Sequence, residues 1–114
     1  MWLTLLLTRF ANLPNNYCIL LYFFSGSGET GKNITYLKNI GVTHMLNTAE
    51  NDVNMNPKRY AKEGICYKGF RCPDLPQADI GQFFDECSEF IDMALSFSIG
   101  KVFINCLLVS YFVG

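Results

Sequence analysis

A cysteine at the end of an apolar run is the first residue of this sequence with clear potential for chemistry. Residues Lys101–Asn105 follow Gly100, read Lys-Val-Phe-Ile-Asn, and lead directly into Cys106. Such a run predicts a buried strand. Catalytic groups of open α/β sheets collect at the carboxyl ends of strands, so Cys106 is a candidate nucleophile, while a core cysteine is the simpler interpretation.

A glycine-rich stretch suggests a second chemistry. Gly26–Lys32 meets the spacing G-x-x-x-x-G-K of phosphate-binding loops, after an apolar run and before an expected helix. Magnesium binding in such loops needs a hydroxyl after the lysine, where this sequence has Asn33. We therefore favour a glycine-rich turn, with nucleotide binding through Gly26–Lys32 as an alternative.

The cysteines indicate neither a disulfide framework nor a metal centre. They form an odd set without a Cys-x-x-Cys pair, each in or beside an apolar run: Cys18, Cys66, Cys72, Cys87 and Cys106. This usage is typical of a reducing compartment, and the single histidine, His44, does not complete a zinc site. We expect no metal and no cofactor.

Composition limits the class of protein and its partners. Nine basic and ten acidic residues give a net charge of −1, without a basic stripe for nucleic acid. The apolar runs Trp2–Leu7 and Cys18–Phe24 are far shorter than the roughly 20 residues of a membrane span. The 114 residues suit one domain, so we assign residues 17–114 to it and leave the apolar segment 1–16 unassigned.

Hydrophobic patterns and turn residues predict the elements that position these groups. Strands are expected over Cys18–Phe24, Val42–Asn47, Ile65–Phe70 and Lys101–Cys106, and short helices over Ile34–Ile40 and Pro57–Glu63, ended by Gly41 and Gly64. Loops are expected over Ser25–Asn33 and Arg71–Ala78. The cations of the second helix, Lys58, Arg59 and Lys62, suit a solvated face better than a kinase-binding patch.

The longest helix is predicted after Asp79, which forms a capping box with Gln82. Its apolar residues recur at helical spacing: Ile80, Phe83, Phe84, Cys87, Phe90, Ile91 and Ala94. The opposite face should be solvated, since it carries Asp85, Glu86, Glu89 and Asp92. Alternating strands and helices predict an α/β fold, a mixed sheet flanked by helices.

Several segments together resemble one family. Tyr36–Glu50, Tyr60–Gly69, Phe70–Asp74, Phe83–Ala94 and Gly100–Cys106 resemble the small, atypical dual-specificity protein phosphatases of the cysteine-based protein tyrosine phosphatase superfamily. The family patterns are "lgitHvlN" for the first segment and "gkvlvHC" for the last. The resemblance implies a protein-tyrosine-phosphatase-like fold, incomplete at the C-terminal end.

The resemblance also implies an activity. Family members dephosphorylate phosphotyrosine and phosphoserine or phosphothreonine in proteins through a cysteinyl-phosphate intermediate. Cys106 occupies the nucleophile position and Asp74 the general-acid position; Asp74 would otherwise be read as a turn residue between two prolines. His44 matches a family position that is not catalytic, and we expect it to be buried and hydrogen-bonded.

The match fails after Cys106. The family loop reads His-Cys-x-x-Gly-x-x-Arg-Ser/Thr, but this sequence has Asn105 before the cysteine, then Val109, Phe112 and Val113. Arginine and backbone N–H groups hold the phosphoryl oxygens in such a site, so we expect a catalytically dead domain truncated at the phosphate-binding loop. Marginal stability is also expected, with exposed apolar surface around Phe103 and the helix beginning at Ile80.

Two further interpretations stay open. One is a non-catalytic interaction fragment, a pseudophosphatase that self-associates or binds a partner through exposed apolar surface. The other is an incomplete gene product without a function. The family points to phosphoproteins as partners, protein kinases among them, in the cytoplasm and also the nucleus. From the charge and the short apolar runs we expect neither nucleic acid nor a membrane as a partner.

Overall fold

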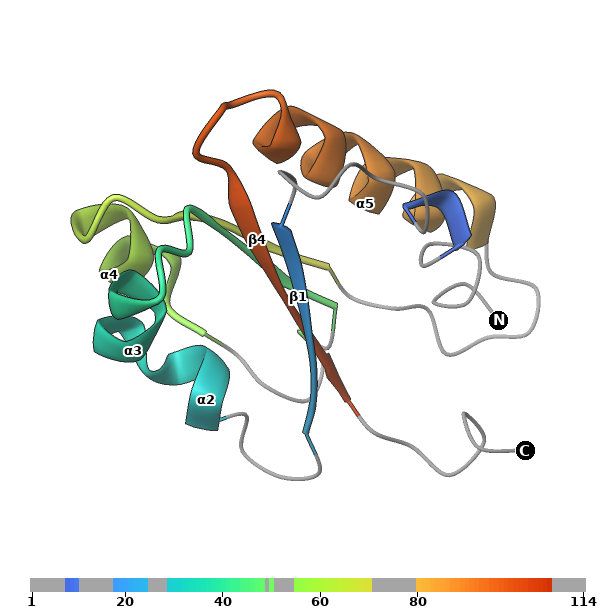
Figure 1. Ribbon diagram of the computed structural model, residues 1–114. Helices are drawn as coiled ribbons and strands as arrows, with labels where there is room; N and C mark the ends of the chain where they lie inside the picture. The colour runs from blue at the N-terminus through green and yellow to red at the C-terminus, as the bar shows by residue number, and fades with distance from the viewer. Residues whose placement is uncertain are drawn as a thin grey trace.

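A four-stranded sheet with helices on both faces forms the fold (Figure 1). The computed structural model describes residues 8–10, 18–24, 29–48, 50, 55–70 and 80–107. The strands are β1 (Cys18–Phe24), β2 (His44–Asn47), β3 (Cys66–Gly69) and β4 (Lys101–Leu107). The helices are α2 (Glu29–Lys32), α3 (Ile34–Asn39), α4 (Pro57–Lys62) and α5 (Ile80–Leu95).

The strands lie in the order β1-β4-β2-β3, and every pairing among these four is parallel. The predicted α/β class, with helices flanking a sheet, is confirmed. We had expected a mixed sheet, whereas these pairings are all parallel. The reason is that helix lies between each strand and the next along the chain, so the chain returns to the same edge before each new strand begins.

Asparagine side chains cap the N-termini of two helices, α3 and α4. Asn33 accepts a hydrogen bond from the backbone N–H of Tyr36 at 3.1 Å, and Asn56 accepts one from Lys58 at 3.0 Å. Pro57 occupies the first turn of α4, where its missing N–H costs nothing. These caps satisfy donors that a helix leaves unpaired at its start.

Glycines end the same two helices, as predicted. Gly41 has φ +85° and Gly64 has φ +77°, the left-handed region that glycine adopts without strain. The chain then reverses, with Val42 N–H donating to the carbonyl of Leu37 at 2.9 Å. Both exits therefore have the geometry of glycine C-caps.

One helical turn was not predicted. Glu29–Lys32 form α2, within the stretch Ser25–Asn33 that we expected to be a loop. Asn33 separates α2 from α3, and its own N–H donates to the carbonyl of Thr30 at 3.2 Å. The first residues of that predicted loop, and all of Arg71–Ala78 and Asp79, lie outside the described residues.

The core on one face of the sheet lies beneath α5, and we call it the α5 core. Its buried residues come from the sheet, from α5 and from the segment 8–10: Phe10, Leu46, Phe70, Cys87, Phe90, Ile91, Ala94, Leu95, Val102 and Ile104. Within α5 they are members of the predicted helical stripe or follow it directly. Phe10 was not anticipated, because the segment 1–16 had no assignment.

The opposite face carries a second core, the α3–α4 core. It contains Leu37, Val42, Met45, Met55, Tyr60, Ile65 and Phe103. Phe103 is 4% exposed, so the expectation that apolar surface around it would be uncovered was wrong. Successive side chains alternate between the faces of a strand, so Phe103 meets α3 and α4 while Val102 and Ile104 meet α5.

The outer face of α5 is solvated as predicted, with Asp85, Glu86, Glu89 and Asp92 exposed. Asp92 also pairs with Arg9 at 2.9 Å, both side chains being about half exposed. Beyond this face, Met93, Phe97 and Ile99 expose apolar side chains. Among the described helices, none combines the length and the apolar character needed to cross a membrane.

The burial of Phe103 leads to a stability prediction. Phe103→Ala should lower the free energy of unfolding by about 3–5 kcal/mol, because it removes a large side chain from the α3–α4 core. Phe97→Ala is the matched control, since Phe97 is 57% exposed, and its cost should stay below about 1 kcal/mol. Urea denaturation followed by circular dichroism measures both. Equal losses would contradict the assignment of Phe103 to a core.

Candidate functional site at the carboxyl edge of the sheet

Cys106 lies where the sequence predicted, at the carboxyl end of a buried strand. It is the residue before the last in β4, and its Cα is in register with Phe23 of β1. Because the pairings are parallel, the carboxyl ends of β1, β2, β3 and β4 meet at this same edge. Asp74, the predicted general acid, lies outside the described residues.

Side chains at this edge of the sheet form a hydrogen-bonded network among the described residues, and we call it the edge network. Its centre is the Glu50 carboxylate, whose Oε2 accepts from the Tyr67 hydroxyl at 2.5 Å and from Asn47 Nδ2 at 2.8 Å. Asn47 Nδ2 also donates to the Tyr67 hydroxyl at 3.1 Å. Gly69 leaves room for this carboxylate, since a Cβ there would overlap Glu50.

Asn105 joins the edge network from β4. Its Nδ2 donates to Asn47 Oδ1 at 3.2 Å, and its own backbone carbonyl accepts from both the N–H and the Oγ1 of Thr48, at 3.0 and 3.1 Å. The side chain of Asn105 is fully buried, and its Oδ1 accepts no hydrogen bond from the part of the chain described here. A Cβ on Gly31 would lie 3.0 Å from that oxygen, so glycine lets the two segments approach without displacing the Asn105 side chain.

Two tyrosines connect the network to α2 and α4. The rings of Tyr60 and Tyr67 stack with centroids 4.9 Å apart, and the Tyr60 hydroxyl donates to the carbonyl of Gly31 at 2.6 Å. Burial raises the pKa of Tyr60 to about 12, against an opposing effect of the neighbouring Arg59 cation. Burial and the hydrogen bond to Glu50 raise the pKa of Tyr67 well above its ordinary value of 10.0.

His44 lies at the other end of β2 and is buried and hydrogen-bonded, which confirms the prediction. It is 7% exposed, and its Nδ1 lies 2.8 Å from Thr43 Oγ1. Its ring packs against Phe90 and Phe97 of the α5 side, with centroids 5.7 and 5.9 Å away. Burial lowers the pKa of His44, which favours the neutral imidazole in the folded state.

The residues expected for nucleotide binding have other roles where they are described. Asn33, at the position of the magnesium-binding hydroxyl, caps α3 with its side-chain oxygen. Gly31 packs tightly under Met45, Met55 and Asn105. Among the residues that the structure covers, no group of three His, Cys, Asp or Glu side chains lies close enough together to hold a metal ion.

The edge network holds the strands together and offers no phosphate anchor of its own. It consists of amides, a phenol and a carboxylate, without a cation to neutralise a phosphoryl group. Sequence reasoning missed Glu50 and Tyr67, because the contacts between them join residues 17 apart in the chain. The available signal was Asn47 and Asn105, two amides that interrupt or end otherwise apolar strands.

Comparison with known proteins gives the class of this chain. No family model matches it. Curated proteins do match, and they make the chain a relative of the dual-specificity protein phosphatases, which confirms the resemblance found in the sequence.

The matched relatives include proteins named dual specificity protein phosphatase 26. The one from Mus musculus is 32% identical over 83 residues, and those from Bos taurus and Homo sapiens are 31% identical over the same length. Each match covers 73% of this chain but 39% of the relative. The chain thus spans well under half the length of these relatives.

The hydrogen bonds of the edge network predict that Tyr67 contributes measurably to the stability of the fold. Tyr67→Phe should cost about 1–2 kcal/mol of unfolding free energy, because the Glu50 carboxylate loses a donor. Tyr36→Phe is the control, since Tyr36 is 43% exposed and should change stability by less than about 0.5 kcal/mol.

The Tyr67 substitution should also change the response to alkali. The folded pKa lies above the unfolded one, so this stabilisation is complete below pH 10 and is lost as the pH rises past it. Wild type should therefore lose more stability than Tyr67→Phe between about pH 9 and 11, measured by urea denaturation. Parallel losses in the two proteins would contradict the contact.

His44 predicts a response to acid. Its pKa is lower in the folded state than the ordinary 6.5, so the unfolded chain binds the extra proton first and stability falls as the pH drops through 6.5. The melting temperature of wild type should decrease between about pH 8 and 5.5 more than that of His44→Gln. Since His44 is the single histidine, identical decreases would exclude this effect.

Proposed function

We propose that the chain is a dual-specificity-phosphatase-like protein that does not hydrolyse phosphoesters and acts through contacts with other proteins, as a pseudophosphatase. The observation that carries this proposal is the sequence around the nucleophile position. Cys106 is present, but Val109, Phe112 and Val113 stand where the family has glycine, arginine and a hydroxyl residue.

The chemistry of phosphoryl transfer explains why these positions matter. A thiolate must attack phosphorus while a bidentate guanidinium and backbone N–H groups hold the phosphoryl oxygens. Loss of a single preorganised donor typically costs about 10²- to 10³-fold in rate. Phenylalanine and valine supply no such donor from their side chains, so both turnover and tight phosphate binding are expected to be lost.

The residue before the cysteine supports the same proposal. Asn105 stands where the family has histidine, and its Nδ2 already donates to Asn47 within the sheet. This amide hydrogen bond links β4 to β2. It therefore contributes to the position of the strand end more than to binding of a substrate.

The partners that we propose follow from the relatives, which are protein phosphatases by name. Phosphoproteins are the expected class, and protein kinases are candidates within it. The cytoplasm, and also the nucleus, are the proposed locations, in keeping with the free thiol at Cys66. Nucleotide binding has less support, because Asn33 serves as a helix cap.

A phosphatase assay tests the proposal. Wild-type protein should release phosphate from a phosphotyrosine peptide at least about 10³-fold more slowly than an active dual specificity protein phosphatase 26 assayed beside it. Cys106→Ser should be indistinguishable from wild type. Circular dichroism of both proteins checks that they are folded.

Release of phosphate that Cys106→Ser abolishes would contradict the proposal and identify the chain as an active enzyme. Release that survives Cys106→Ser would indicate a contaminating phosphatase. That preparation would then be purified further and assayed again.

A further inference from the structure

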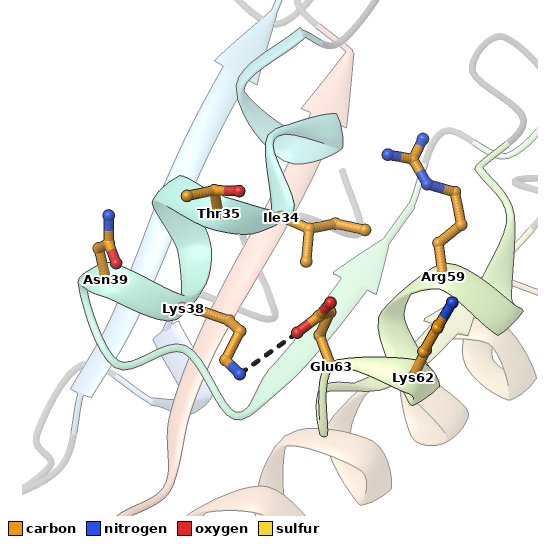
Figure 2. Close-up of a pocket in the computed structure, with 7 residues that line it drawn as sticks. All are labelled: Ile34, Thr35, Lys38, Asn39, Arg59, Lys62 and Glu63. Atoms are coloured by element: carbon orange, nitrogen blue, oxygen red, sulfur yellow. Dashed lines mark hydrogen bonds and ion pairs between the residues drawn. The ribbon is translucent and has the colours of Figure 1, made fainter.

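A groove between α3 and α4 is a second site, apart from the edge network. Its volume is about 540 Å³, within the range of ligand pockets, and seven side chains line it: Ile34, Thr35, Lys38, Asn39, Arg59, Lys62 and Glu63. Figure 2 shows these side chains on the two facing helices, with Arg59 extending away from the Lys38–Glu63 pair. No residue of the edge network lines this groove.

The groove carries an excess of positive charge. Three of its side chains are cationic and one is anionic. The described part of the chain provides no carboxylate partner for Arg59 or Lys62. Lys38 pairs with Glu63 at 3.3 Å, but both side chains are about half exposed, so an incoming carboxylate can compete for this lysine.

This positive charge is local. The whole chain has a net charge of −1, and a second groove, between β3 and α5, has the opposite balance, with Glu86 and Glu89 against Lys68. From the sequence we expected these cations to lie on a solvated helix face. Such a face would be open to solvent, with no second helix opposite it. Here α3 supplies the opposite wall, including Thr35 and Asn39 as further hydrogen-bonding groups.

We propose that the α3–α4 groove binds a short acidic segment of a partner protein, with Asp or Glu carboxylates received by Arg59, Lys62 and Lys38. The guanidinium of Arg59 is suited to bidentate contact with a carboxylate. Ile34 adds an apolar surface for the stem of an acidic side chain. The proposal rests on the proposed function in that it expects a protein partner, although binding requires no catalysis.

Charge and size favour this occupant over other polyanions. Nucleic acid and anionic membranes are bound by extended basic surfaces, whereas this site is one groove on a chain with net negative charge. An acidic peptide needs only a few matched charges over a short length. Its binding should weaken as salt screens the exposed cations.

Fluorescence anisotropy with a labelled dodecapeptide containing four consecutive Glu residues tests the proposal on the full chain. The peptide should bind saturably, and more weakly at about 0.15 M salt than at about 0.02 M. The double variant Arg59→Glu/Lys62→Glu should weaken binding by at least about tenfold. Should that variant fail to fold, Arg59→Gln/Lys62→Gln should give a smaller loss in the same direction.

The matched control is Lys58→Glu/Lys68→Glu, which changes the net charge equally at exposed residues outside this groove. It should change affinity by less than about twofold. Equal weakening by both double variants, equal binding of a Gln peptide, or no saturable binding would overturn the proposal. Wild-type oligomers that do not bind the peptide would also overturn the proposal if the Arg59→Glu/Lys62→Glu variant were monomeric. In that case a second copy of the chain would occupy the groove.

Inorganic phosphate gives a further arm of the test. Saturable phosphate binding in the groove without peptide binding would overturn the proposal in favour of a simple anion site. Phosphatase activity, by contrast, would contradict only the proposed function, because peptide binding is measured independently of turnover.

Discussion

The parallel pairing of β4 with both β1 and β2 is the constraint on which the rest of the structure depends. β4 lies between these strands, with Phe103 in the α3–α4 core and Val102 and Ile104 in the α5 core. Both cores therefore assemble on this one strand. The pairing also brings Asn47 opposite Asn105 and leaves Cys106 at the common carboxyl edge.

The sequence was informative wherever a local pattern decides the structure. The apolar spacing from Ile80 to Ala94 predicted α5, and Gly41 and Gly64 predicted helix ends, because each depends on neighbouring residues. Strand direction depends on pairing between distant segments, so the sequence alone did not specify that all the described strands pair in parallel. The position of Phe103 follows from strand alternation combined with the side of the sheet that each helix covers, and only the structure supplies the second fact.

The candidate site was predictable in part for the same reason. The apolar residues before Cys106 predicted a buried strand, and this predicted that Cys106 lies at the end of β4. Glu50, Tyr67 and Asn47 come from separate segments, and their hydrogen bonds require the sheet to be formed. The groove between α3 and α4 likewise needs both helices in place, so the charges of Lys58, Arg59 and Lys62 alone suggested only a solvated face.

Our central proposal is that this chain, a relative of the dual-specificity protein phosphatases, has no phosphate anchor beside Cys106. Binding of vanadate, an oxyanion that mimics a phosphoryl group in transfer, tests that claim most directly. Isothermal titration calorimetry should detect no saturable binding of vanadate to wild type at vanadate concentrations up to about 1 mM. A Kd of about 1 mM corresponds to a binding free energy near −4.1 kcal/mol. Saturable binding that Cys106→Ser abolishes would contradict the claim.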